Sequence, residues 1–89
     1  MKPVPMLPDE IIRIEEAAHR AGVCSRTIRR WNRVHAIARQ SCPGAPLQIS
    51  VIALEMVMEG DTEALERLRA NERTHPDVRR YIERVGVPL

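Results

Sequence analysis

The sequence predicts a small, mainly α-helical domain that contains one short β-hairpin, and three observations lead to this fold class. The chain has 89 residues, which is enough for one domain with a modest core. Apolar residues recur at helical spacing over most of its length, and glycine or proline separates these stretches. Dense turn chemistry at residues 41–46 (SCPGAP) stands between two short segments with strand character. With an aromatic content of only 2%, the core must be built from aliphatic side chains.

Residues 14–33 (IEEAAHRAGVCSRTIRRWNR) predict two helices joined at a tight corner. Gly22 suits the corner, because glycine adopts the left-handed backbone of such a turn without penalty. Ala18 lies four residues earlier, where a small side chain lets the two helices cross closely. Buried contacts are expected at Ala17, Ala21, Val23, Ile28 and Trp31. This order of small and apolar positions is typical of a helix-turn-helix.

The starts of these two helices are marked less clearly. The first helix is expected over about residues 14–21, with Arg13 at its N-cap, although arginine is a poor capping residue. The second helix begins near Cys24 or Ser25. Ser25 is chemically the better cap, but Cys24 lies where the spacing from the turn places one.

A hairpin is expected after the second helix. Residues 36–40 form a candidate strand, and residues 47–49 form a return strand whose Leu47 and Ile49 face the core. A plain loop is the alternative, because the two prolines of the segment disfavour long regular pairing. Together with the two preceding helices, a hairpin wing would make this a winged helix-turn-helix.

Composition divides the chain into three parts. Residues 1–12 are expected to form a flexible arm, because three prolines interrupt the segment and no periodicity marks it. Residues 13–60 form the winged helix-turn-helix domain, which includes a very apolar helix over residues 51–59 capped by Ser50. Residues 61–89 form further helices that pack either on this domain or on a neighbouring subunit.

Two helices are expected in the C-terminal part. One covers about residues 62–72, with a favourable pair between Glu63 and Arg67. The other covers residues 76–85 and begins at Pro76. Its apolar stripe consists of Val78, Tyr81, Ile82 and Val85. The stripe is either part of the core or a docking face for a neighbouring subunit.

The positive charge is concentrated in the middle of the chain. The formal net charge is only +2, but no carboxylate occurs between Glu16 and Glu55. That interval contains Arg20, Arg26, Arg29, Arg30, Arg33 and Arg39. A surface without carboxylates suits a polyanion, because a carboxylate would repel phosphates. Arginine also offers bidentate hydrogen bonds to guanine and phosphate, although a genome rich in G and C would produce the same preference for arginine over lysine.

The second helix separates apolar from basic side chains. Its inward side carries Ile28, Trp31 and His35. Its outward side carries Arg26, Arg30 and Arg33, with Arg29 on the flank and Thr27 at the edge. An ordinary amphipathic helix with a solvated arginine face is the alternative, but the turn signature and the missing carboxylates favour DNA binding. Near the hairpin loop, three polar residues are placed for phosphates or the minor groove: Arg39, Gln40 and Ser41.

No other chemistry is indicated by the sequence. It has no nucleophile motif, carboxylate pair or glycine-rich phosphate loop, so we expect neither an enzyme nor a cofactor. Cys24 and Cys42 lack ligand spacing with the scattered histidines, so we expect no metal site. No apolar run approaches the roughly 18 residues of a membrane span, and the first ten residues lack an apolar signal core. We therefore expect a cytoplasmic protein.

The order of these features resembles a known family. The segment GVCSRTIRRW is followed by a hairpin ending in GAPLQIS and by a helix beginning VIALEM. This order is similar to that of winged-helix proteins of the MerR-like superfamily, particularly the small excisionases, also called recombination directionality factors. The resemblance covers about residues 13–60 and is most specific at Gly22, Val23, Thr27, Ile28, Arg30 and Trp31. Cys24 stands where the family has a serine, and the wing lacks the basic tip common in the family.

The resemblance implies a non-enzymatic protein that binds and bends attachment-site DNA, so that an integrase excises a mobile element. It implies double-stranded DNA and an integrase as partners, cooperative assembly of several copies on DNA, and no membrane. The implied DNA-binding residues are Ser25, Arg26, Thr27, Arg30 and Arg33 in the major groove and on adjacent phosphates, Arg29 and Arg20 on phosphates, and Arg39, Gln40 and Ser41 in the wing. A small winged-helix transcriptional regulator and a phage-type packaging or adaptor protein are the alternatives.

Overall fold

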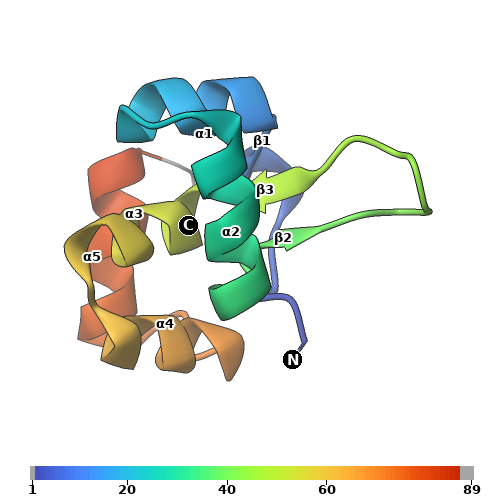
Figure 1. The fold of residues 1–89 in the computed structure, drawn as a ribbon. Coiled ribbons are helices and arrows are strands. Elements are labelled where there is room, and N and C mark those ends of the chain that lie inside the picture. Colours follow the sequence, from blue (N-terminus) through green and yellow to red (C-terminus); the bar gives the residue numbers. More distant parts are fainter. Residues whose placement is uncertain (1, 87–89) are drawn as a thin grey trace.

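The computed structural model describes residues 2–86, so residues 87–89 of the expected C-terminal part lie outside the described residues. Its elements in chain order are a 3₁₀ turn η1 (Pro8–Glu10), β1 (Ile11–Ile12), α1 (Ile14–Ala21), α2 (Ser25–His35), β2 (Ala38–Arg39), β3 (Gln48–Ser50), α3 (Val51–Glu59), α4 (Thr62–Arg69) and α5 (Pro76–Val85). Figure 1 shows α1 lying across one end of α2, and the loop between β2 and β3 reaching out on one side. The predicted fold class is confirmed: a mainly helical, winged helix-like domain with a short hairpin and further C-terminal helices.

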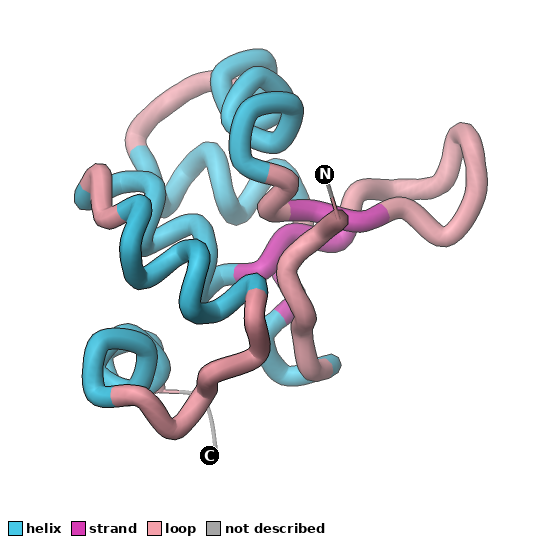
Figure 2. Tube along the Cα trace, turned by 90° about the horizontal axis from the view of Figure 1, so that it is seen from below, coloured by secondary structure: helices cyan, strands magenta, loops and turns pink. Residues whose placement is uncertain are grey.

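The wing is a hairpin within a three-stranded antiparallel sheet. β2 pairs with β3, with Ala38 opposite Ile49 and Arg39 opposite Gln48, so the predicted hairpin is confirmed and the plain loop is not. The sequence did not predict β1, which pairs with the other edge of β3 and gives the strand order β1-β3-β2. The loop over residues 40–47 projects beyond the helices, as the view from below in Figure 2 also shows.

The N-terminal arm is packed against the domain, which corrects the expectation of a flexible arm over residues 1–12. Val4 and Met6 are buried in the core, and the amide of Val4 donates to the carbonyl of Ala36 over 3.1 Å. Glu10 is also buried and forms an ion pair with Arg73 from the α4–α5 turn. The prolines prevent a helix here, but extended backbone still buries alternate apolar side chains.

The helix-turn-helix corner has the predicted geometry. Gly22 adopts a left-handed backbone with φ of 70°, and its amide reaches the carbonyls of Ala18 and His19 at the end of α1. Ala17 and Ile28 are fully buried beside the corner. Because a residue with a Cβ is strained at this φ, glycine fixes the path of the chain into α2.

The C-terminal helices share one core with the rest of the chain. Ser50 caps α3 by accepting from the amide of Ala53 over 3.1 Å. The apolar α3 is covered by α1, α4 and α5, and this contiguous core runs from Val4 to Ile82. Val78, Tyr81 and Ile82 of the α5 stripe are therefore core residues, and the described surface of α5 is polar.

Helix α4 differs from the sequence prediction at its end and in its ion pair. It stops at Arg69, and Asn71 then takes a positive φ of 63°, so the expected extension to residue 72 is wrong. Arg67 does not pair with Glu63. It turns instead toward the following loop, where it lies 3.5 Å from Glu72 and 3.6 Å from Asp77.

Candidate nucleic-acid interface

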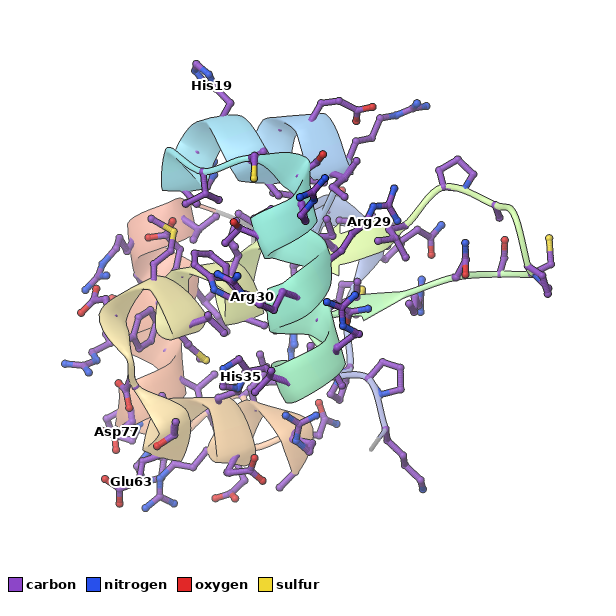
Figure 3. The ribbon with its side chains drawn as sticks, viewed as in Figure 1. His19, Arg29, Arg30, His35, Glu63 and Asp77 are labelled. Carbon is purple, nitrogen blue, oxygen red and sulfur yellow. The ribbon has the colours of Figure 1, made fainter. Side chains whose placement is uncertain are left out.

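The solvent-facing side of α2 is formed by arginines. At about 100° per residue, Arg26, Arg30 and Arg33 fall within about 60° of arc, and all three are exposed. Ile28 points the opposite way and is fully buried. Arg29 is exposed as well, and Figure 3 shows it on the wing side of α2, with Arg30 on the other side. The predicted separation of the apolar and basic sides of this helix is confirmed.

These arginines have no carboxylate beside them. Within residues 2–86, no carboxylate oxygen lies within 4.0 Å of the side-chain nitrogens of Arg13, Arg26, Arg29, Arg30, Arg33 and Arg39. By contrast, a carboxylate lies within that distance of each arginine after residue 60: Arg67, Arg69, Arg73, Arg79, Arg80 and Arg84. Since a neighbouring carboxylate offsets the attraction of an arginine for a phosphate, only the first group presents undiminished positive charge.

Arg20 differs from the other candidate arginines. It lies near the end of α1, and its Nη1 is 3.7 Å from Oε2 of Glu55 on α3. Both side chains are partly exposed, so the pair is weak. Arg20 is nevertheless turned toward a carboxylate, and it is the least favourably placed of the predicted phosphate contacts.

The wing residues are partly engaged in holding the wing itself. Nε of Arg39 donates to Oε1 of Gln48 over 2.8 Å, which leaves its outer nitrogens free. Nε2 of Gln40 donates to the carbonyl of Ala45 across the loop. Ser41 is exposed next to it. The outer nitrogens of Arg39 and the hydroxyl of Ser41 therefore face solvent, whereas Gln40 stiffens the loop.

At the start of α2 two side chains contact each other, and neither makes a capping bond to a backbone amide of the helix. Cys24 is the N-cap residue, and its Sγ lies 3.5 Å from Oγ1 of Thr27. The hydroxyl and the amide of Thr27 lower the pKa of the exposed Cys24 thiol. Thr27 is half-buried and lies at the edge of the arginine face, while Ser25 is exposed in the first turn.

Two side chains that sequence reasoning missed fix α2 in place. Oδ1 of Asn32 accepts from the amide of Ala38 over 2.8 Å and so ties the helix to the first wing strand. Arg69 of α4 donates to the carbonyl of His35 at the end of α2 and to the carbonyl of Lys2, both over 2.7 Å. The Asn32 contact spans six residues across the end of α2, and the Arg69 contacts span 34 and 67 residues. Helical periodicity in the sequence gives no signal for either kind of contact.

Two further residues of this surface could have been found from the sequence. Val34 is 55% exposed and lies next to Arg30 on the helical wheel, about 40° away. Arg13 is exposed at the N-cap of α1 and borders the space between α1, α2 and the wing. An apolar residue on a charged face and an arginine at a cap position are the signals that point to them.

The described residues contain no group of three or more His, Cys, Asp or Glu that would hold a metal ion. No helix among them has both the length and the apolar character required to cross a bilayer. The chain matches no protein-family model, no curated protein sequence and no solved structure at a significant level. The features that bear on function are therefore the geometry and charge of this surface and the resemblance of its sequence motifs.

Proposed function

We propose that this protein binds double-stranded DNA, with α2 in the major groove and the wing on the neighbouring backbone and minor groove. The observation that carries the proposal is the row of exposed arginines on α2 without a carboxylate within 4.0 Å in the described part of the chain. An arginine surface that only served solubility would be compatible with interspersed carboxylates, as on α4 and α5. The major groove, about 12 Å wide, admits a helix and presents acceptor atoms to guanidinium groups.

The arrangement of the arginines on α2 suits both kinds of DNA contact. Arg26, Arg30 and Arg33 project along one line of the helix, from which base edges are reached. Arg29 is placed on the flank for the phosphate backbone. Val34, exposed beside Arg30, provides an apolar contact of the kind that a thymine methyl group accepts.

We further propose that the DNA-bound protein acts as an excisionase, a recombination directionality factor that bends attachment-site DNA for an integrase. This part rests on the motif resemblance over residues 13–60. It is physically consistent, because one small module reads few base pairs and gains affinity by binding as several adjacent copies. Such a role needs no catalytic group, because the protein would act only by bending the DNA.

DNA binding is tested first with two single variants, Arg26→Ala and Arg30→Ala. Each is expected to weaken binding to a footprinted site by about 1–3 kcal/mol if it reads a base. Arg79→Ala removes the same charge from α5 and serves as the matched control, with affinity close to that of the wild type. Fluorescence anisotropy on labelled duplexes measures all three. If Arg26→Ala and Arg30→Ala both bind as tightly as the wild type, the assignment of α2 is wrong.

The excisionase role is tested by footprinting on attachment and promoter DNA of the source genome, followed by an excision assay with the integrase of the element. Extended, periodic protection of attachment DNA and integrase-dependent excision would support the role. Protection confined to a promoter, without any effect on excision, would indicate a transcriptional regulator. Absence of binding to any duplex at micromolar protein would indicate a protein-binding adaptor.

A further inference from the structure

A groove of about 400 Å³ lies between the wing and the helix-turn-helix. One wall is the start of α1 with the middle of α2, and the other is the wing loop over residues 44–47. Gly44, Ala45 and Pro46 give most of the loop wall short side chains, and Leu47 and Gln40 complete it. Gly44 faces open space, and the bond from Gln40 to the Ala45 carbonyl holds this wall in place. An elongated ligand can therefore approach the backbone of the loop closely.

The charged side chains of the groove come from its helical wall. Arg13 borders it at the N-cap of α1 and Arg29 from α2, and neither has a carboxylate within 4.0 Å among the described residues. The one carboxylate that lines the groove is Glu15 in the first turn of α1, and no ion pair within residues 2–86 involves it. The net charge of the lining is therefore positive by one unit, which favours an anionic segment.

The position of the groove indicates which anion it would hold. When a helix occupies a major groove and a wing reaches the adjacent minor groove, the strand that separates the two grooves passes between them. In this protein the space between α2 and the wing is the groove bordered by Arg13 and Arg29. Each repeat unit of that strand carries one negative charge, so the strand would meet a lining of net positive charge.

We propose that this groove holds one sugar–phosphate strand of the bound duplex, and that Arg13 and Arg29 bind its phosphates. The inference rests on the proposed DNA binding and extends it, because Arg13 lies outside α2 and the wing. Glu15 opposes the strand and limits the affinity. Arg13 makes no capping bond and is exposed, so its replacement leaves the folded domain intact.

The test uses the full chain and a mixed-sequence duplex of about two helical turns. Arg13→Ala is expected to weaken binding about tenfold on every duplex, since a charge-assisted bond is lost without loss of sequence reading. The slope of log K against log salt should become shallower by about 0.9 for the one phosphate contact removed. Arg29→Ala should behave alike, and Arg79→Ala, which removes the same charge from α5, should change neither quantity.

Glu15→Gln is expected to change the DNA affinity in the opposite direction to Arg13→Ala. Removing the opposing carboxylate should tighten binding about twofold to fivefold on every duplex. Glu63→Gln, an exposed carboxylate of α4 that no ion pair within residues 2–86 involves, is the control and should leave the affinity unchanged.

The outcomes separate the two proposals. If the wild type binds DNA while Arg13→Ala keeps its affinity and its salt slope, the groove assignment is wrong and the DNA-binding proposal stands. If Arg13→Ala loses affinity at one sequence only, Arg13 reads a base and the strand assignment is wrong. If the wild type binds no duplex at all, both proposals are wrong. Circular dichroism and unfolding midpoints equal to the wild type exclude misfolding as the cause of any loss.

Discussion

Arginines occur with equal frequency in two regions of this molecule and have opposite surroundings there. Residues 17–54 carry six arginines and no carboxylate, whereas residues 55–89 carry six arginines and eight carboxylates. Among the described residues 2–86, Arg20 is the one arginine of the first region with a carboxylate within 4.0 Å, whereas each arginine of the second region has one. The formal net charge of +2 therefore conceals a strongly positive middle region between two regions that each carry more carboxylates than basic side chains. The two sets of arginines therefore differ in whether a carboxylate lies beside them.

The comparison predicts a division of effects between stability and affinity. Replacing arginines of the C-terminal region should lower the free energy of unfolding and remove no direct DNA contact. Replacing exposed arginines of α2 should weaken DNA binding and change the free energy of unfolding by no more than about 0.5 kcal/mol. Three variants test the C-terminal side of this division, from the largest expected effect to the smallest.

Arg73→Met is expected to be the most destabilising. It leaves the carboxylate of Glu10, which is 1% exposed, without its cation. Breaking one partner of a buried ion pair costs about 3–5 kcal/mol, because an uncompensated charge remains inside. Urea unfolding followed by circular dichroism measures the change. The double variant Glu10→Gln/Arg73→Met removes both charges and should recover much of the loss. A loss in the single variant no larger than that of Arg79→Ala would contradict the structural role.

The Glu10–Arg73 pair is an example of a contact that could not be predicted from the sequence. The helices, the hairpin and the corner at Gly22 were predicted, because each follows from local periodicity or turn chemistry. The packed arm and β1 were not, because their partners lie far away in the chain. A proline-rich segment gives no periodic signal, although the apolar Val4 and Met6 were visible in it.

The candidate site could be predicted in part for the same reason. The arginine face of α2 follows from a helical wheel, and its lack of carboxylate neighbours follows from the acid-free interval. Two other features depend on how α3 and the wing are placed. They are the contact between Arg20 and Glu55 and the hydrogen bond from Gln40 to the Ala45 carbonyl. Such long-range contacts arise only in the folded chain.

Arg69→Met tests the link between the two regions, because Arg69 is an arginine of α4 that holds the end of α2. Loss of its bonds to the carbonyls of His35 and Lys2 should cost about 1–3 kcal/mol of stability. DNA binding should weaken as well, since the end of α2 is released, while the salt slope stays unchanged because no phosphate contact is lost. Arg67→Met on the same helix is the control, with DNA affinity like that of the wild type. A shallower salt slope for Arg69→Met would mean that Arg69 touches DNA itself.

The smallest expected effect concerns Asp61, which caps α4 beside Tyr81. The amide of Ala64 (3.1 Å), the hydroxyl of Tyr81 (2.8 Å) and Arg80 hold the pKa of the Asp61 carboxyl below its ordinary value of 3.8. Because the pKa of Asp61 is lower in the folded state, its carboxylate stabilises the fold at pH values above the ordinary pKa. This contribution is lost as the pH falls through the folded-state pKa. Tyr81→Phe should therefore cost about 1 kcal/mol at neutral pH.

The acid range shows whether the bond from the Tyr81 hydroxyl depends on the charge of Asp61. Once Asp61 is protonated, the hydroxyl of Tyr81 faces a neutral partner, so the stability difference between the wild type and Tyr81→Phe should shrink as pH falls below the ordinary value of 3.8. Urea unfolding across an acid pH series measures that difference. A difference that stays constant through this range would mean that the contribution of the Tyr81 hydroxyl does not depend on the charge of Asp61.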